Sequence, residues 1–135
     1  MQISPHLVFP GNSEAVLQHY RDALGGDLEI MRFAGSPAEE QMPAGWGEKV
    51  LYGTLRSPFG LVHCMDASPE RAGTPGDNFV LGVDTDSEAQ TDEIFAKLLA
   101  GGSVVMPLQK TFWSPKFGML TDRFGIKWMV NFQGA

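Results

Sequence analysis

The sequence SEAVLQHYRDALGG, at residues 13–26, recurs as SEAQTDEIFAKLLAGG at residues 87–102. Both copies begin with Ser-Glu-Ala and end with Gly-Gly, and the second copy is two residues longer than the first. Apolar residues recur along each copy at intervals of three and four positions, which predicts an amphipathic helix. An internal repeat of this kind indicates that the chain is built from two similar modules.

Both predicted helices carry start and stop signals. Asn12 or Ser13 is the expected N-cap of the first helix, because a short polar side chain accepts a hydrogen bond from a free backbone N–H group. Gly25 is the expected stop, because glycine adopts the left-handed conformation without strain. Ser87 and Gln90 fit a capping box at the start of the second helix.

Short apolar segments flank each predicted helix, and each half of the chain ends in a predicted hairpin. The expected strands are HLVF (6–9), LEIMRF (28–33), FVLGV (79–83) and SVVMPL (103–108), and the expected hairpins lie at 49–65 and 116–130. The hairpin turns SPFG and DRFG match each other, with Phe59-Gly60 aligned on Phe124-Gly125. The order of elements therefore predicts βαβββ twice.

This order predicts an α+β fold made of two βαβββ modules, at residues 1–66 and 77–135. A chain of 135 residues is long enough to bury one substantial core, so we expect a single domain over residues 1–135. Two segments rich in Gly, Pro and acidic residues, 34–48 and 66–77, are expected to be a loop and the linker between the modules.

The composition excludes several classes of function. A formal net charge of −6 leaves no basic surface for nucleic acid, so we expect no nucleic-acid partner. No apolar segment approaches the length of a membrane span, and the N-terminus lacks the pattern of a signal peptide. The single cysteine, Cys64, forms no intrachain disulfide and fits a reducing compartment. We therefore expect a cytoplasmic protein that does not bind membranes.

The paired βαβββ plan resembles the vicinal oxygen chelate superfamily, which includes glyoxalase I, extradiol dioxygenases and bleomycin-binding proteins. Within it, LVFPGNSEAVLQHYRDALGG (7–26) and KTFWSPKFGMLTDRFGIKWMVN (110–131) resemble the PhnB-like branch, which often carries the label 3-demethylubiquinone-9 3-methyltransferase. The resemblance covers essentially the whole chain. It implies an open, glyoxalase-like barrel, a homodimer and a small-molecule ligand, but it specifies the reaction poorly because one fold hosts many activities.

Metal-using members of that superfamily take ligands from the first strand and the last hairpin strand of each module. Counting along this sequence places Pro5, Cys64, Asn78 and Met129 at these positions. Pro5 cannot ligate through its side chain, Asn78 is only a weak oxygen donor, and Cys64 and Met129 offer sulfur, so the set does not suit the borderline and hard divalent ions that the family uses. We therefore expect no metal and no other cofactor, and the sequence leaves open whether any reaction is catalysed.

Two histidines provide the alternative. His6 lies one residue from the expected ligand position, and a shift of one residue moves a side chain to the opposite face of a strand. His6 is therefore expected to lie outside the cup unless a bulge turns it inward. Trp128 is expected in the helix-facing core, and His63 aligns with it, so His63 is expected to face the helix layer. If His6, His63 and a loop glutamate did converge, the protein would instead be a metal-dependent lyase, dioxygenase or thiol transferase with a divalent ion.

The remaining interpretation is an apolar cup that binds a small molecule. Strand alternation and the family alignment predict a ligand pocket formed by Phe9, Tyr52, Cys64, Asn78, Trp113 and Met129. A simpler alternative is that these side chains only fill the core, as aromatic residues usually do. A third alternative is a module that sequesters a cationic antibiotic, as bleomycin-binding relatives do.

Overall fold

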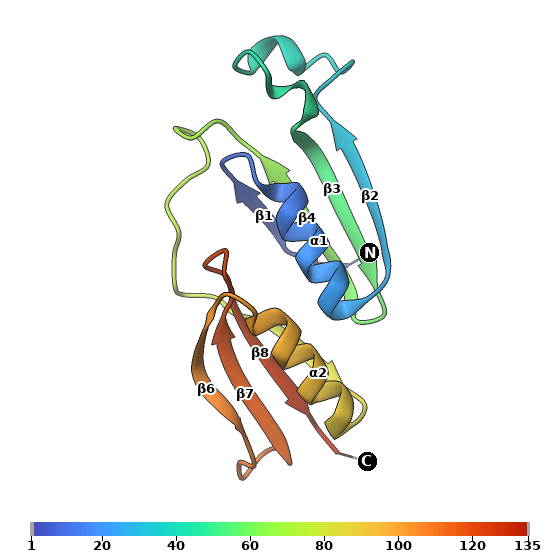
Figure 1. Ribbon diagram of the computed structural model, residues 1–135, viewed down its shortest axis with the longest axis vertical. Helices are drawn as coiled ribbons and strands as arrows, with labels where there is room; N and C mark the ends of the chain where they lie inside the picture. Colours follow the sequence, from blue (N-terminus) through green and yellow to red (C-terminus); the bar gives the residue numbers. More distant parts are fainter. Residues whose placement is uncertain (1, 135) are drawn as a thin grey trace. The chain divides into compact units, whose positions relative to one another are not determined.

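The computed structural model describes residues 2–134 and contains two compact units, Met1–Thr74 and Pro75–Ala135 (Figure 1). Each unit contains one four-stranded sheet and one α-helix. The predicted α+β class and the two βαβββ modules are therefore confirmed. Within residues 2–134, neither α-helix is long and apolar enough to cross a lipid bilayer.

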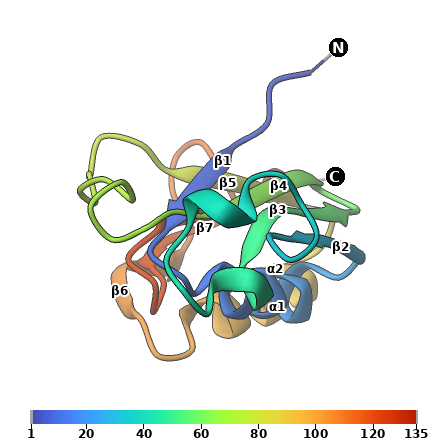
Figure 2. The same ribbon diagram turned by 90° about the horizontal axis from the view of Figure 1, so that it is seen from above.

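The first unit forms a mixed sheet with the strand order β1-β4-β3-β2. Its elements are β1 (His6–Phe9), α1 (Ser13–Leu24), β2 (Asp27–Arg32), η1 (Glu39–Gln41), η2 (Trp46–Glu48), β3 (Val50–Ser57) and β4 (Gly60–Asp66). The pair β1–β4 is parallel and the other pairs are antiparallel. α1 packs against one face of this sheet (Figure 2).

The second unit repeats this plan with the strand order β5-β8-β7-β6. Its elements are β5 (Leu81–Thr85), α2 (Glu88–Leu99), β6 (Ser103–Gln109), β7 (Lys116–Thr121) and β8 (Lys127–Phe132). β5 begins two residues later than the strand predicted at 79–83, and Phe79 lies exposed before it. The parallel pair is again formed by the first and last strands of the unit.

The ends of α1 are only partly as predicted. Gly25 ends the helix with a φ of 79°, and its N–H donates to Arg21 O at 2.7 Å. Neither Asn12 nor Ser13 caps the start with its side chain. Instead, the buried carboxylate of Asp66 accepts a hydrogen bond from the Ser13 N–H at 2.9 Å. A carboxylate is favourable there because the helix N-terminus carries partial positive charge.

The start of α2 has the predicted capping box. Ser87 Oγ accepts a hydrogen bond from the Gln90 N–H at 3.1 Å. The side chain of Gln90 reaches back and accepts from the N–H of Asp86 at 2.7 Å, one residue before the N-cap. One backbone donor that the helix itself leaves free, and one that precedes its N-cap, are thereby satisfied.

The core of the first unit lies between α1 and its sheet. Val16, Leu17 and Tyr20 of α1 are fully buried. A side chain at Gly53 would overlap Leu17, so this glycine allows α1 to approach β3 closely. Register partners share a face of the sheet, and Cys64 pairs with both Gly53 and Leu7. Leu7, Gly53 and Cys64 therefore face α1.

The core of the second unit is organised in the same way. A Cβ atom at Gly118 would lie 2.8 Å from the ring of Phe95 on α2, so the Gly118 position faces the helix. Gly118 pairs with Val130, and the next pair on the same face is Leu120 with Trp128. Leu120, Trp128 and Val130 are all almost fully buried. The prediction that Trp128 belongs to the helix-facing core is confirmed.

The two hairpin turns differ by one residue, contrary to the predicted alignment. In the first hairpin Ser57 pairs directly with Gly60. In the second, the N–H of Asp122 donates to Ile126 O at 2.8 Å, and Gly125 has a φ of 88°. The second turn therefore has three central residues where the first has two. Gly60 therefore corresponds to Ile126 and not to Gly125. Every residue of β4 after the turn is equivalent to a residue of β8 one position later than the sequence alignment predicted.

Candidate functional site

The strands of the first sheet present a second set of side chains, which points away from α1. We call this surface the helix-free face of the first sheet. It carries alternate residues of each strand, because successive side chains of a strand point to opposite faces. Its members are His6, Val8, Asp27, Glu29, Met31, Tyr52, Thr54, Arg56, Leu61, His63 and Met65.

Two histidines, one tyrosine and one threonine form a cluster on this face. The rings of His6 and His63 stack with centroids 4.3 Å apart and planes inclined by 20°. The Tyr52 ring lies 5.3 Å from His63 and 5.8 Å from His6. His63 Nδ1 and Thr54 Oγ1 are 3.0 Å apart, and both residues are buried. The hydrogen bond to Thr54 and the stacking with His6 hold His63 in place.

The surroundings of His63 favour its neutral form. Burial lowers the pKa of His63, and the positive charges of His6 and Arg56 lower it further. Arg56 lies two residues after Thr54 on β3, so it belongs to the same face. A neutral imidazole both donates and accepts hydrogen bonds. The cluster is therefore suited to hydrogen bonding with a ligand group that also lies near the positive charge of Arg56.

The structure corrects the predicted orientation of several residues in the first unit. His63 was expected to face the helix layer, but it lies on the helix-free face beside His6. Cys64 and Phe9 were expected to line the pocket, but they lie on the face that α1 covers, where Cys64 is completely buried. Tyr52 lies on the helix-free face. On β1 and β4 the alternation was assigned one residue out of step, which exchanges the two faces, whereas Tyr52 on β3 lies on the face predicted for it.

The predicted pocket residues of the second unit lie in three different settings. Met129 pairs with Gly82 and Met119, on the face of the second sheet that points away from α2. Trp113 is exposed in the loop before β7, and its ring meets Phe117 edge-on at 5.4 Å. Asn78 is exposed and precedes β5 rather than belonging to it. Met129 alone of the three is part of the sheet.

The corrected register also changes the four positions that correspond to the family's metal ligands. Met129 follows Ile126 by three residues, as His63 follows Gly60, so Met129 and His63 are equivalent. Each pairs with the parallel first strand of its unit, Met129 with Gly82 and His63 with His6. The equivalent positions are thus His6, His63, Gly82 and Met129, and not Pro5, Cys64, Asn78 and Met129. The longer DRFGI turn was the sequence signal for this shift.

These four positions do not fit the divalent ion that the resemblance implies. Gly82 has no side chain and Met129 offers only a soft thioether, which leaves two nitrogen donors. Catalytic metal sites usually have three protein ligands. The two imidazoles also stack face to face, whereas ligating nitrogens must point towards one common atom. Among residues 2–134, no group of three or more His, Cys, Asp or Glu side chains is placed to hold a metal ion.

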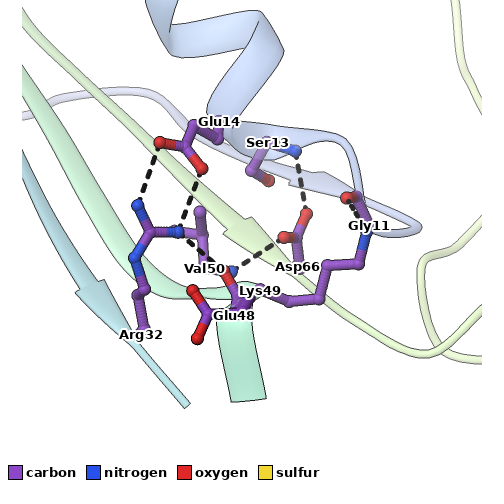
Figure 3. Close-up of polar contacts among 8 residues, drawn as sticks. All are labelled: Gly11, Ser13, Glu14, Arg32, Glu48, Lys49, Val50 and Asp66. Carbon is purple, nitrogen blue, oxygen red and sulfur yellow. Dashed lines mark hydrogen bonds and ion pairs between the residues drawn. The ribbon is translucent and has the colours of Figure 1, made fainter. Parts of the chain in front are cut away.

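A second candidate is a charged cleft beside the start of α1, with a volume of about 260 Å³ (Figure 3). Its lining residues are Gly11, Glu14, Arg32, Glu48, Lys49, Val50 and Asp66. Arg32 meets Glu14 in a forked ion pair, with both N···O distances 3.0 Å. Arg32 also donates to Glu48 O at 2.6 Å, and Lys49 Nζ donates to Gly11 O at 3.0 Å.

The groups of this cleft mainly bind one another. Figure 3 shows the Asp66 carboxylate between the Ser13 and Val50 backbones, and it accepts an N–H from each at 2.9 Å. The hydrogen bond from Arg32 holds the pKa of Glu14 below its usual value. These contacts join the turn before α1 to the start of β3. We assign the cleft a structural role that the sequence did not reveal, because its partners lie far apart in the chain.

Comparison with known proteins establishes the family. The model of the 3-demethylubiquinone-9 3-methyltransferase family matches residues 1–131. Protein YjdN of Escherichia coli is 31% identical over 142 residues, which cover 97% of this chain and 95% of that protein. The chain therefore belongs to this PhnB-like family, as the sequence predicted.

Solved structures agree with this assignment. Protein PA1353 from Pseudomonas aeruginosa is 37% identical with a TM-score of 0.87, and the match covers 98% of both chains. A PhnB protein from Bacillus cereus is 25% identical with a TM-score of 0.76, over 98% of this chain and 99% of that one. A glyoxalase/bleomycin resistance/dioxygenase protein from Burkholderia phytofirmans, at 13% identity and a TM-score of 0.65 over 97% of each chain, shows the shared fold.

Proposed function

We propose that this PhnB-like protein binds a small molecule on the helix-free face of its first sheet, without a metal ion. The observation that carries the proposal is the cluster of His6, Tyr52 and His63, in which oriented polar groups lie beside accessible aromatic and apolar surface. Small-molecule sites have this character, since a few placed polar groups fix the orientation of a ligand held by apolar contacts.

The second unit supports the metal-free part of the proposal. A metal site built in the manner of the superfamily needs donors from both units, and the equivalent positions there are Gly82 and Met129. The two stacked imidazoles of the first unit serve instead as hydrogen-bonding groups. The reaction, if there is one, is therefore expected to use the chain's own side chains.

We do not propose methyl transfer, although the family is named after it. A nucleotide-type cofactor is usually held by a glycine-rich turn between a strand and a helix start. The turn between β1 and α1 reads PGN and has one glycine, Gly11. The carbonyl of that glycine accepts a hydrogen bond from Lys49 within the charged cleft.

We also propose that the protein is a cytoplasmic homodimer with no nucleic-acid partner. The family resemblance supports the dimer, and the acidic charge and the lone buried cysteine support the other two points. Light scattering at several protein concentrations tests the dimer, and cell fractionation tests the compartment.

The function is tested by the thermal midpoint of the purified protein against a panel of small organic molecules, with and without a chelator. We expect at least one compound to stabilise the protein, by about 2.7 kcal/mol when its concentration is 100 times Kd. The chelator should leave this effect unchanged, and Tyr52→Ala with His6→Ala should remove it. A stoichiometric divalent ion in the purified protein, together with binding that requires it, would contradict the proposal and favour a metal-dependent lyase, dioxygenase or thiol transferase.

A further inference from the structure

Two neighbouring rows of side chains cross the helix-free face of the first sheet, and they differ in chemistry. The polar row follows from the register, in which His63 pairs with both His6 and Thr54, and Thr54 pairs with Glu29. One step along the strands, every member of the next row is apolar or aromatic. This apolar row consists of Val8, Met65, Tyr52 and Met31.

The apolar row remains largely accessible. Val8 is 42% exposed, Met31 58% and Tyr52 38%, and Met65 between them is half-buried. Neighbouring strands lie about 4.8 Å apart, so a row across four strands extends over roughly 14 Å. That length matches a flat molecule of two or three fused or linked rings. Tyrosine offers a rigid face to such a molecule, and methionine adapts its shape to it.

Charge is distributed unevenly along the polar row. Its β1–β4 end carries the two imidazoles, and Arg56 lies one step further along β3. The opposite edge, on β2, carries the carboxylates of Glu29 and Asp27, with Asp27 paired to Arg56. Hydrogen-bond donors therefore gather at His6 and His63, next to one end of the apolar row. The positive charge of Arg56 acts on His63 from the row beyond, where Asp27 and Leu61 flank it.

From this juxtaposition we infer that the ligand of this face is a small amphipathic acid. Its flat apolar body lies along Val8, Met65, Tyr52 and Met31, and its anionic group lies beside His6, His63 and Arg56. The inference rests on the proposed function and names the class of its ligand. It runs against the overall charge of the protein, because a net charge of −6 repels anions in general. A preference for an acid would therefore be due to the side chains of this face and not to the net charge of the protein.

Two fluorescent probes with one aromatic skeleton test this inference. 8-Anilinonaphthalene-1-sulfonate carries an acidic group, and N-phenyl-1-naphthylamine lacks it. We expect the sulfonate to bind at least about ten times more tightly to the native protein, measured by fluorescence titration. Tyr52→Ala should weaken both probes, whereas His6→Gln with Arg56→Gln should remove only the preference. Met106→Ala, in the second sheet, is the matched control and should change neither.

The outcomes separate the inference from the proposed function. Equal affinity for the two probes, with Tyr52→Ala still weakening both, would overturn the acid as ligand class and leave the binding face in place. Probe binding that Tyr52→Ala does not alter, or no binding at all, would overturn both. The thermal midpoint of each variant is measured in parallel, so that a loss of binding is compared only among folded proteins.

Discussion

The two units share one plan and differ most on their helix-free faces. In both, the first strand pairs in parallel with the last, and a helix covers one face of the sheet. The first unit places His6 and His63 at two equivalent positions of the other face. The second unit places Gly82 and Met129 there, and Met119 and Met106 continue the row from Met129. The scaffold is repeated, but the chemistry of its free face is not.

The difference shows that the helix-facing core constrains each unit more strongly than the opposite face does. The covered positions keep apolar or small residues in both units, such as Cys64 in the first and Val130 in the second. The free positions differ, because the two imidazoles of the first unit correspond to a glycine and a thioether in the second. Since packing does not fix these positions, their residue types are the natural place to look for function.

The largest expected effect concerns the buried carboxylate that organises the second hairpin. Asp122 accepts hydrogen bonds from the N–H groups of Phe124 and Ile126 and from Trp128 Nε1. Asp122→Ala leaves a buried indole N–H without this partner and should lower the free energy of unfolding by about 3 kcal/mol or more. Chemical denaturation measures the change. Asp92→Ala, which removes only a surface ion pair, should cost about 1 kcal/mol or less, and equal costs would contradict the assignment.

A smaller change in stability is expected when a glycine is replaced by alanine, and its size should differ between the two faces of the sheets. Gly53→Ala places this group against Leu17 beneath α1 and should destabilise the protein by about 1–3 kcal/mol, because a packed core resists added volume. Gly82→Ala places it 3.4 Å from Met129 Cγ on a free face, where ordinary contact results. Thermal unfolding compares the two variants. If Gly82→Ala proved the more damaging, the assignment of the faces would be wrong.

The smallest expected effect is a dependence of stability on pH. The hydrogen bond from Arg32 lowers the pKa of Glu14 below its ordinary value of 4.5. The ion pair therefore stabilises the fold above that value, and this contribution is lost as the pH falls through the lowered pKa. Glu14→Gln should reduce stability at pH 7 by less than about 1 kcal/mol, and the difference from the native protein should vanish in acid. Denaturation at a series of pH values measures this.

Glu93 in the second unit provides the comparison for this titration. Its pKa is lowered by the hydrogen bond from Lys97, so the sign of the pH dependence is the same. The Glu93–Lys97 pair is more exposed than the Glu14–Arg32 pair, so the effect of Glu93→Gln should be the smaller of the two. A pH-independent cost for Glu14→Gln would show that the ion pair is not its cause.

The sequence predicted the architecture well because the repeat and the periodicity are local signals. The helices, the Gly25 stop, the Ser87–Gln90 box and the burial of Trp128 all follow from residues close together in the chain. The cap of α1 did not follow, since Asp66 lies 53 residues from Ser13. Only the folded sheet brings such partners together.

The orientation of the candidate site was predicted wrongly for a specific physical reason. The match of Phe59-Gly60 with Phe124-Gly125 is real in sequence, but the second turn holds one more residue. A strand has a period of two, so an error of one residue exchanged His63 with Cys64. The Asp122 side chain supports this longer turn, because it accepts the N–H groups of Phe124 and Ile126.

The methyl groups of the methionines provide the most direct test of a ligand face on the first sheet. Met31 and Met65 lie on its helix-free face, Met106, Met119 and Met129 on that of the second sheet, and Met42 in the loop before β3. A titration of methyl-labelled protein with 8-anilinonaphthalene-1-sulfonate, followed by NMR, reports the chemical shifts of all these methyl groups in one experiment. We predict shifts at Met31 and Met65 with little change at the other four. Shifts confined to Met106, Met119 and Met129 would show that the ligand does not bind the first sheet.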